Sequence, residues 1–256
     1  MAAVVHFASH AQDPASPAPH EPRFVHVFVA LCDNDSQGIV PVPEKIGNGD
    51  DPINNLYWGC ADGLKSYFKK SRDWELLPFS KEPPRIILER CIFKHANSET
   101  YLVADAYRGI EIKKATEDFL NAASGQPTPP LKVLSGSKPV QISMRGNADL
   151  VAFIGHNGLM DFDLPTVKPL GEGKRDAVVL CCRSEDYFRE RLEGMRVRPL
   201  LLTRQLMYPG SFILKTAIDG WLEGESRDQI RKRAGKAYAD NQKISVGAAT
   251  GVFTAF

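Results

Sequence analysis

The chain lacks both a strong net charge and a long apolar run. Its 32 Lys and Arg residues balance 31 Asp and Glu residues, which leaves a formal net charge of +1. So small an excess gives no electrostatic reason to expect nucleic acid or an anionic membrane as a partner. No stretch approaches the roughly 18 apolar residues of a membrane-spanning helix, and the first ten residues lack the pattern of a secretory signal. We therefore expect a cytoplasmic protein with no nucleic acid and no membrane as partner.

Cysteine is sparse, and its spacing fits neither a disulfide framework nor a zinc site. Only five Cys occur in 256 residues, and none forms a CxxC pattern or stands at ligand spacing from a His. No GxGxxG or P-loop pattern follows the first expected strand, and the acidic segments 33–38 and 47–51 do not follow the EF-hand spacing. The sequence therefore predicts no metal and no cofactor, with the thiols kept reduced.

Apolar segments of strand and helix periodicity alternate along most of the chain. Alternation of this kind predicts an α/β fold with three αβα layers around a mostly parallel sheet of about six strands. Strands are expected at 23–34, 84–95, 99–107, 148–155, 176–182 and 198–205, and helices at 51–68, 110–123, 185–194, 209–222 and from 226 onward.

The composition divides the chain into three parts. Residues 1–22 are rich in Pro, Ala and Ser and predict a flexible N-terminal arm. Residues 23–243 carry the alternating strands and helices and form the α/β domain. Residues 244–256 are an apolar C-terminal tail whose place the pattern does not reveal.

Two chemically reactive side chains stand at the ends of the two most apolar expected strands. His156 follows the strand 148–155 within Gly-His-Asn-Gly, and Cys182 ends the strand 176–182. Ligand sites of parallel sheets lie beyond the carboxyl ends of their strands. A Cys and a His that meet there form a nucleophile and its base, because a neighbouring imidazole and a helix N-terminus both stabilise a thiolate.

The glycines around His156 fit the same chemistry. They let the backbone approach a substrate closely and expose N–H groups toward a developing oxyanion. We expect the N–H groups of Gly158 and Cys182 to hold that oxyanion. Adjacent Cys181 and Cys182 point to opposite faces of a strand, and Cys182, nearer the following helix, is the expected nucleophile.

These residues resemble a known family pattern. An apolar strand followed by His and Gly, then a second apolar strand that ends in a small residue and Cys, is similar to the caspase-like cysteine peptidases of the CHAT, clostripain and caspase superfamily. The segment LCCRS at 180–184 resembles the Gln-Ala-Cys-Arg-Gly of caspases, with Arg183 after the nucleophile. Segment 195–238 resembles the strand-helix-helix ending of the CHAT branch, so the chain resembles a divergent member.

The resemblance implies a cysteine endopeptidase that cleaves peptide bonds through Cys182 and His156 and acts on a peptide or protein substrate. Two departures keep a catalytically silent binding or signalling module open as an alternative. Asn157 separates His156 from Gly158, and the loop between His156 and Cys182 is shorter than the roughly 50 residues of caspases. A third interpretation is a protein with a doubly wound sheet that binds a small molecule.

The charged residues expected at the strand ends suggest a substrate preference. Asp33, Asp35 and Asp105 would select Arg or Lys before the scissile bond through charge-assisted hydrogen bonds. Arg183, with Arg108, would instead select Asp. The three carboxylates favour basic substrates, and we expect Asp33, Asp35, Asp105 and Arg183 to contact the substrate. The oligomeric state is not indicated by the sequence.

Overall fold

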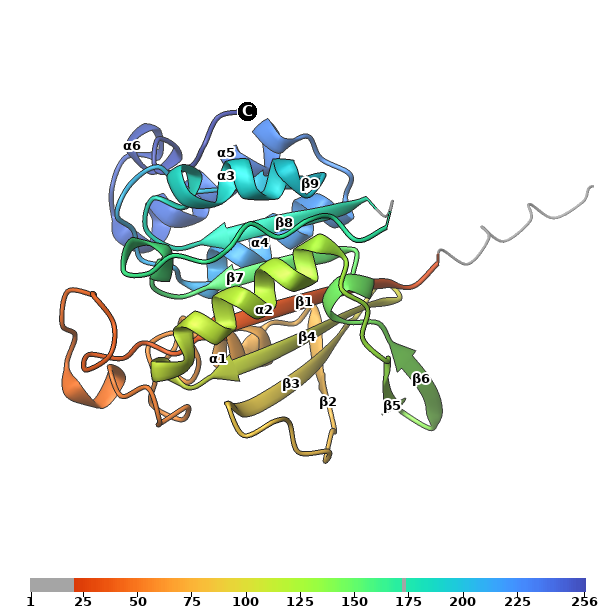
Figure 1. Ribbon diagram of the computed structural model, residues 1–256. Helices are drawn as coiled ribbons and strands as arrows, with labels where there is room; N and C mark the ends of the chain where they lie inside the picture. Colours follow the sequence, from red (N-terminus) through yellow and green to blue (C-terminus); the bar gives the residue numbers. More distant parts are fainter. Residues whose placement is uncertain (1–20, 172–173) are drawn as a thin grey trace, which may run out of the picture.

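A seven-stranded mixed sheet forms the centre of the molecule (Figure 1). The structure, a computed structural model, describes residues 21–171 and 174–256. The strand order is β2-β3-β4-β1-β7-β8-β9. The strands are β1 (Arg23–Ala30), β2 (Trp74–Leu77), β3 (Ile87–His95), β4 (Thr100–Tyr107), β7 (Leu150–Ile154), β8 (Arg175–Leu180) and β9 (Val197–Leu201), and β5 (Leu131–Ser135) pairs with β6 (Lys138–Ile142) in a separate hairpin.

Five strands, β4, β1, β7, β8 and β9, run parallel, and β3 and β2 add an antiparallel edge. From β1 the chain first places β4 on one side and then β7, β8 and β9 on the other. This is a doubly wound order whose direction reverses beside β1. The carboxyl ends of β1, β7 and β8 therefore meet at one edge of the sheet, next to the reversal.

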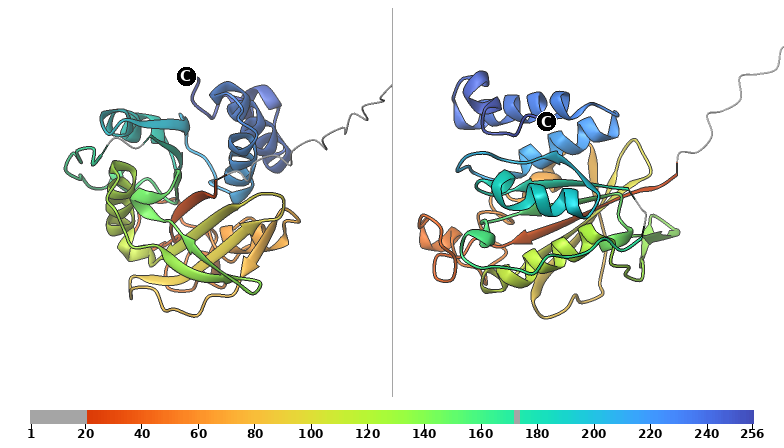
Figure 2. Two further views of the ribbon diagram at one scale, coloured as in Figure 1. Left: turned by 90° about the vertical axis from the view of Figure 1, so that its right-hand side faces the viewer. Right: turned by 45° about the horizontal axis from the view of Figure 1, so that its top comes forward.

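Helices cover both faces of the sheet (Figure 2). One face packs against α2 and α3 through an apolar core that includes Phe28, Phe119, Phe153 and Phe188. The other face packs against α1, α4 and α5 around Trp58 and Phe68. The three-layer αβα class predicted from the sequence is thus confirmed. The helices are α1 (Leu64–Lys70), α2 (Ile112–Ser124), α3 (Ser184–Gly194), α4 (Ser211–Leu222), α5 (Arg227–Gln242) and α6 (Val246–Thr250), with 3₁₀ turns η1 (Glu44–Ile46), η2 (Gly109–Glu111), η3 (Arg145–Asn147) and η4 (Gly158–Met160).

The helix expected over 51–68 forms only from Leu64 onward, so that prediction is wrong for residues 51–63. Residues 52–62 make a series of turns around the buried side chain of Asn55. Its amide accepts a hydrogen bond from the Cys32 N–H at 3.1 Å and donates one to the Cys32 carbonyl at 2.8 Å. Asn55 thus extends the hydrogen bonding of β1, a tertiary role that helical periodicity does not reveal. The four-residue edge strand β2 was likewise not expected.

Residues 244–256 pack onto the α/β domain. Helix α6 lies against α5, and the Phe253 side chain is fully buried. Phe253 also forms an antiparallel bridge with Thr203, just beyond β9. Residues 1–20 of the expected N-terminal arm lie outside the described residues.

A buried ionic cluster crosses the sheet under α2. Asp105 on β4 is fully buried and accepts a two-pronged hydrogen bond from Arg90 on β3, at 2.5 and 2.7 Å. His26 Nε2 lies 3.1 Å from the same carboxylate, and His26 Nδ1 accepts the Arg145 N–H at 2.9 Å. Because Nδ1 accepts, the proton of a neutral His26 lies on Nε2 and is donated to Asp105. Burial would by itself raise the pKa of Asp105, but the bonds from Arg90 and His26 hold it below its usual range.

This cluster makes stability depend on pH. Burial lowers the pKa of His26, despite the nearby Asp105. The folded chain keeps His26 neutral, whereas the unfolded chain binds a proton at this residue below pH ~6.5. Proton binding by the unfolded chain favours unfolding. The stability that neutral His26 contributes is therefore present above pH ~6.5 and is lost as the pH falls below that value. We expect the free energy of unfolding to fall by up to about 1.4 kcal/mol per pH unit from this group. Urea denaturation at pH 7.5, 6.5 and 5.5 measures it. His26→Gln, whose amide can still donate and accept, should flatten the dependence, and an equal slope in both proteins would contradict the assignment.

Candidate functional site

Cys182 and His156 line one cavity at the carboxyl edge of the sheet. The cavity has a volume of about 460 Å³. Its walls come from the loops that follow β1, β7, β8 and β9, which is where a doubly wound sheet places its ligand site. The lining residues are Gly38, Ile39, Val40, Val42, Leu56, Tyr57, Gly155, His156, Met160, Cys182, Leu206, Met207, Tyr208 and Pro209.

His156 is held at the end of β7 by a carboxylate that was not predicted. The His156 side chain is only 6% exposed, and its Nε2 lies 2.7 Å from Asp161 Oδ2. The same oxygen accepts the Gly38 N–H at 3.3 Å, which ties the loop after β1 to the loop after β7. A proton on Nε2 that is donated to Asp161 leaves the other ring nitrogen, Nδ1, as the proton acceptor. Asp161 therefore orients the His156 ring beside the cavity that Cys182 also lines.

Cys182 lies in the sharp turn between β8 and α3. The next residue, Arg183, has a positive φ of 50°. This left-handed conformation turns the chain abruptly and is strained for any residue other than glycine. The Cys182 Sγ accepts the Met207 N–H at 3.5 Å and lies 3.7 Å from the Met207 carbonyl, to which its S–H can donate. Cys182 is half-buried, whereas Cys181 is fully buried on the other face of the turn.

Ser184 is the first residue of α3, and its side chain does not cap the helix. Its hydroxyl lies inside the domain, where it donates to the Val179 carbonyl at 2.9 Å and contacts Thr203 Oγ1 at 3.0 Å. The start of α3 is thereby fixed to the ends of β8 and β9. The bond anchors the turn that carries Cys182.

Asn157 joins the two halves of the site. This side chain is fully buried, and its amide donates to the Cys182 carbonyl at 2.7 Å. Its Oδ1 accepts the Leu159 N–H at 3.2 Å and begins η4. The residue that interrupts the His-Gly pattern thus holds the end of β7 against the end of β8. Within the described parts of the chain, the His156 ring and the Cys182 Sγ face the same cavity without a hydrogen bond between them.

Of the two expected oxyanion donors, one is already engaged. The Gly158 N–H donates to the His156 carbonyl at 3.1 Å. A Cβ at this position would come within 2.5 Å of the Phe162 ring, so that ring would have to shift to admit a side chain. The Cys182 N–H donates to no acceptor in the described residues. Cys182 is therefore the donor that geometry leaves available, and Gly158 serves packing in this structure.

The four residues expected to contact substrate do not line the cavity. Asp33 uses its carboxylate within its own loop, where it accepts the Ser36 hydroxyl at 2.6 Å and the Asp35 N–H at 3.1 Å. The Asp35 residue is exposed. Arg183 lies outside and pairs with Asp186 at 2.7 Å.

The placement expected for Asp105 is wrong, because its side chain cannot reach the strand-end loops. β4 continues to Tyr107, so Asp105 belongs to the strand itself and not to the loop after it. It faces α2, on the side of the sheet opposite Tyr57, and its carboxylate is consumed by Arg90 and His26. Arg108, which was expected near the substrate with Arg183, pairs with Asp50.

The five thiols differ sharply in exposure, which gives a labelling test. Burial raises the pKa of three thiols. The pKa of Cys32 is raised to about 11 and that of Cys91 to about 12, and the pKa of Cys181 is also raised. Only Cys60 shares with Cys182 a half-buried position, and burial raises its pKa too.

We expect iodoacetamide to alkylate Cys182 fastest, because the thiolate is the reacting form and the His156 imidazole that lines the same cavity can accept the thiol proton. Peptide mapping after brief labelling at neutral pH measures the rates, with Cys60 as the internal control. His156→Ala should slow Cys182 and leave Cys60 unchanged. Equal rates at both thiols would show that the imidazole does not activate Cys182.

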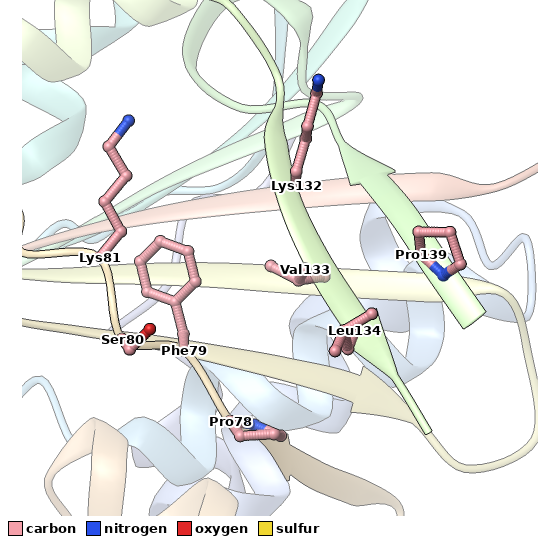
Figure 3. A pocket seen from close by; sticks show the side chains of 8 residues that line it. All are labelled: Pro78, Phe79, Ser80, Lys81, Lys132, Val133, Leu134 and Pro139. Carbon is pink, nitrogen blue, oxygen red and sulfur yellow. The ribbon is translucent and has the colours of Figure 1, made fainter. Parts of the chain in front are cut away.

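A second cavity, on the opposite edge of the sheet order, carries no comparable chemistry. Figure 3 shows a cleft between the segment after β2 and the β5–β6 hairpin, with Phe79 across from Val133. Its volume is about 500 Å³, and its polar lining is Ser80, Lys81 and Lys132. Neither a thiol nor an imidazole lines it. A further cavity of about 600 Å³ is lined by His95 but by no thiol, so the cavity that joins Cys182 to His156 remains the candidate catalytic site.

Neither similarity to known proteins nor a metal site assigns a function to this chain. No protein-family model, curated protein or solved structure matches the chain. In residues 21–171 and 174–256 no group of three or more His, Cys, Asp or Glu side chains is placed to hold a metal ion. The same residues contain no helix of the length and apolarity that crossing a membrane requires. The function must therefore be inferred from the geometry at Cys182.

Proposed function

We propose that this protein is a cysteine peptidase of the caspase-like type, in which Cys182 is the nucleophile and His156 is the general acid and base. The observation that carries the proposal is one shared cavity. Two reactive side chains from neighbouring parallel strands line it at the edge of the sheet where such folds place their sites.

The reaction follows from the positions of the groups. His156 Nδ1 takes the thiol proton, and the sulfur attacks the carbonyl carbon of the scissile bond. The oxyanion that forms accepts the Cys182 N–H. The carbon–nitrogen bond then breaks, and the imidazolium returns its proton to the leaving amine. Water, deprotonated by His156, hydrolyses the thioester, which releases the acid and restores the thiol.

Asp161 supports both proton transfers. Its carboxylate, 2.7 Å from His156 Nε2, orients the ring and stabilises the imidazolium that forms twice in each cycle. The bond from Asn157 to the Cys182 carbonyl keeps the nucleophile turn and the base loop together. Neither side chain needs to touch the substrate for these roles.

A catalytically silent binding module is the second candidate. It is favoured by the missing hydrogen bond between the His156 ring and the Cys182 sulfur, and by the engaged N–H of Gly158. In free peptidases such contacts are often long and tighten only when substrate binds, so the peptidase is the first choice.

Cleavage of peptides with a trapped intermediate tests the proposal. Reduced, folded protein is incubated with fluorogenic peptides that carry Leu, Phe, Arg, Lys or Asp before the reporter. We expect reporter release and, after rapid acid quench, an acyl adduct on Cys182 by mass spectrometry. Absence of cleavage of every peptide, with no adduct, would favour the silent module.

A further inference from the structure

The cavity at Cys182 has apolar walls from its floor to its mouth. Most of its lining side chains are aliphatic, sulfur-containing or aromatic. Three apolar side chains of the lining are also exposed to water, Val40 at 84%, Leu206 at 68% and Met160 at 42%. Clustered exposed apolar side chains at a cavity mouth are typical of a surface that a ligand covers.

The same lining carries no charged side chain. It contains no Asp, Glu, Lys or Arg, and its polar members are His156, Cys182, Tyr57 and Tyr208. Burial raises the pKa of both phenols, so each remains a neutral hydroxyl at neutral pH. A charged substrate side chain placed here would lose its water without gaining an ion pair, which is unfavourable. The charged groups nearby, Asp33, Asp161 and Arg183, cannot compensate, because none lines the cavity and each is engaged with another partner.

We propose that this cavity binds an apolar side chain, of the size of Leu, Met or Phe, on the residue whose carbonyl Cys182 attacks. This specificity rests on the proposed peptidase function. Cys182 is part of the cavity lining. When Cys182 attacks a carbonyl carbon, the side chain of the residue that carries this carbonyl therefore lies next to the cavity. A volume of about 460 Å³ lies within the range of small-ligand sites, about 300–1,000 Å³. The chain thus selects by apolar burial and not by the basic charge that its aspartates suggested.

Binding and cleavage are measured separately, so that the two proposals can fail independently. Acetylated tetrapeptide amides that end in Leu, Ala, Arg or Asp are titrated into Cys182→Ala protein by calorimetry. The matching fluorogenic peptides are assayed with the native chain. We expect the Leu peptide to bind at least about ten-fold more tightly than the Arg and Asp peptides, and to be cleaved at least about ten-fold more efficiently.

Each outcome has one interpretation. Leu-selective binding without cleavage keeps the apolar site and overturns the peptidase. Cleavage that prefers Arg or Asp keeps the peptidase and overturns the apolar site. Equal binding of all four peptides, or no binding by any, overturns the apolar site whatever the assay shows.

A pair of exposed leucines provides the matched control. Leu206→Asp places a carboxylate at the cavity mouth, and Leu134→Asp places one on the β5–β6 hairpin, where Leu134 is 55% exposed. Both are surface changes, so both variants should fold, which circular dichroism and the melting temperature verify. We expect Leu206→Asp to reduce binding of the Leu peptide at least about ten-fold and to improve that of the Arg peptide, while Leu134→Asp changes neither. Unaltered binding by Leu206→Asp would remove this cavity from the recognition site.

Discussion

Replacing Cys182 by Ala is expected to lower the rate of peptide cleavage by at least about 10⁴-fold. Loss of the nucleophile removes the covalent route, and what remains is the stabilisation that binding and the oxyanion donor supply. The matched control is Cys60→Ala, since Cys60 is likewise half-buried but lies outside the cavity lining. Steady-state kcat/KM on the best fluorogenic peptide measures the effect.

The contrary result would be equally informative. Residual cleavage in Cys182→Ala within ten-fold of the native rate would mean that another group is the nucleophile. The neighbouring Cys181 is a poor replacement, because it is fully buried and burial raises its pKa. Such a result would therefore mean that the nucleophile is neither of these two cysteines.

Replacing Asp105 by Ala is expected to lower the free energy of unfolding by about 3–5 kcal/mol. The change removes the carboxylate that accepts from both Arg90 and His26, and the Arg90 side chain is only 7% exposed. A buried guanidinium without its counter-charge pays its desolvation in full, which is the reason for the large cost. Urea denaturation followed by fluorescence and circular dichroism measures it.

Asp35→Ala is the matched control for this experiment. Asp35 belongs to the same residue type, was predicted for the same role, and is exposed in its loop. We expect it to change stability by less than about 0.5 kcal/mol. A loss of similar size in both variants would show that Asp105 is not the centre of a buried ionic cluster.

The parts of the site that lie on the two central strands could be predicted from the sequence. Short, continuously apolar strands are those buried on both faces of a parallel sheet, and β7 and β8 are indeed neighbours in register. The residues that follow them, His156 and Cys182, consequently reach one cavity. Adjacency and direction of the strands were sufficient for this part of the prediction.

The charged residues were misplaced because their partners come from strands far apart in the sequence. The sequence alone predicts that Asp105 lies at the end of its strand, facing the loops. In the structure Asp105 lies within β4, between Arg90 on β3 and His26 on β1. Pairing of this kind depends on strand order, which hydrophobic periodicity does not contain. Asp161 was missed for the opposite reason. It lies only five residues after His156, but an exposed carboxylate in a loop gives no signal until the loop conformation brings it to the ring.

The segment that bridges Thr203 also has a consequence for self-association. The Arg204 N–H donates to the Val252 carbonyl at 2.8 Å, and the Thr254 N–H donates to the Leu202 carbonyl at 2.9 Å. An uncovered sheet margin can recruit the same margin of a second molecule and start ordered aggregation. Here the donors and acceptors that continue β9 are occupied from within the chain, and Pro199 inside β9 brings no N–H to such a contact. Residues 202 and 204 therefore have backbone partners within the chain and cannot start such a contact with a second molecule.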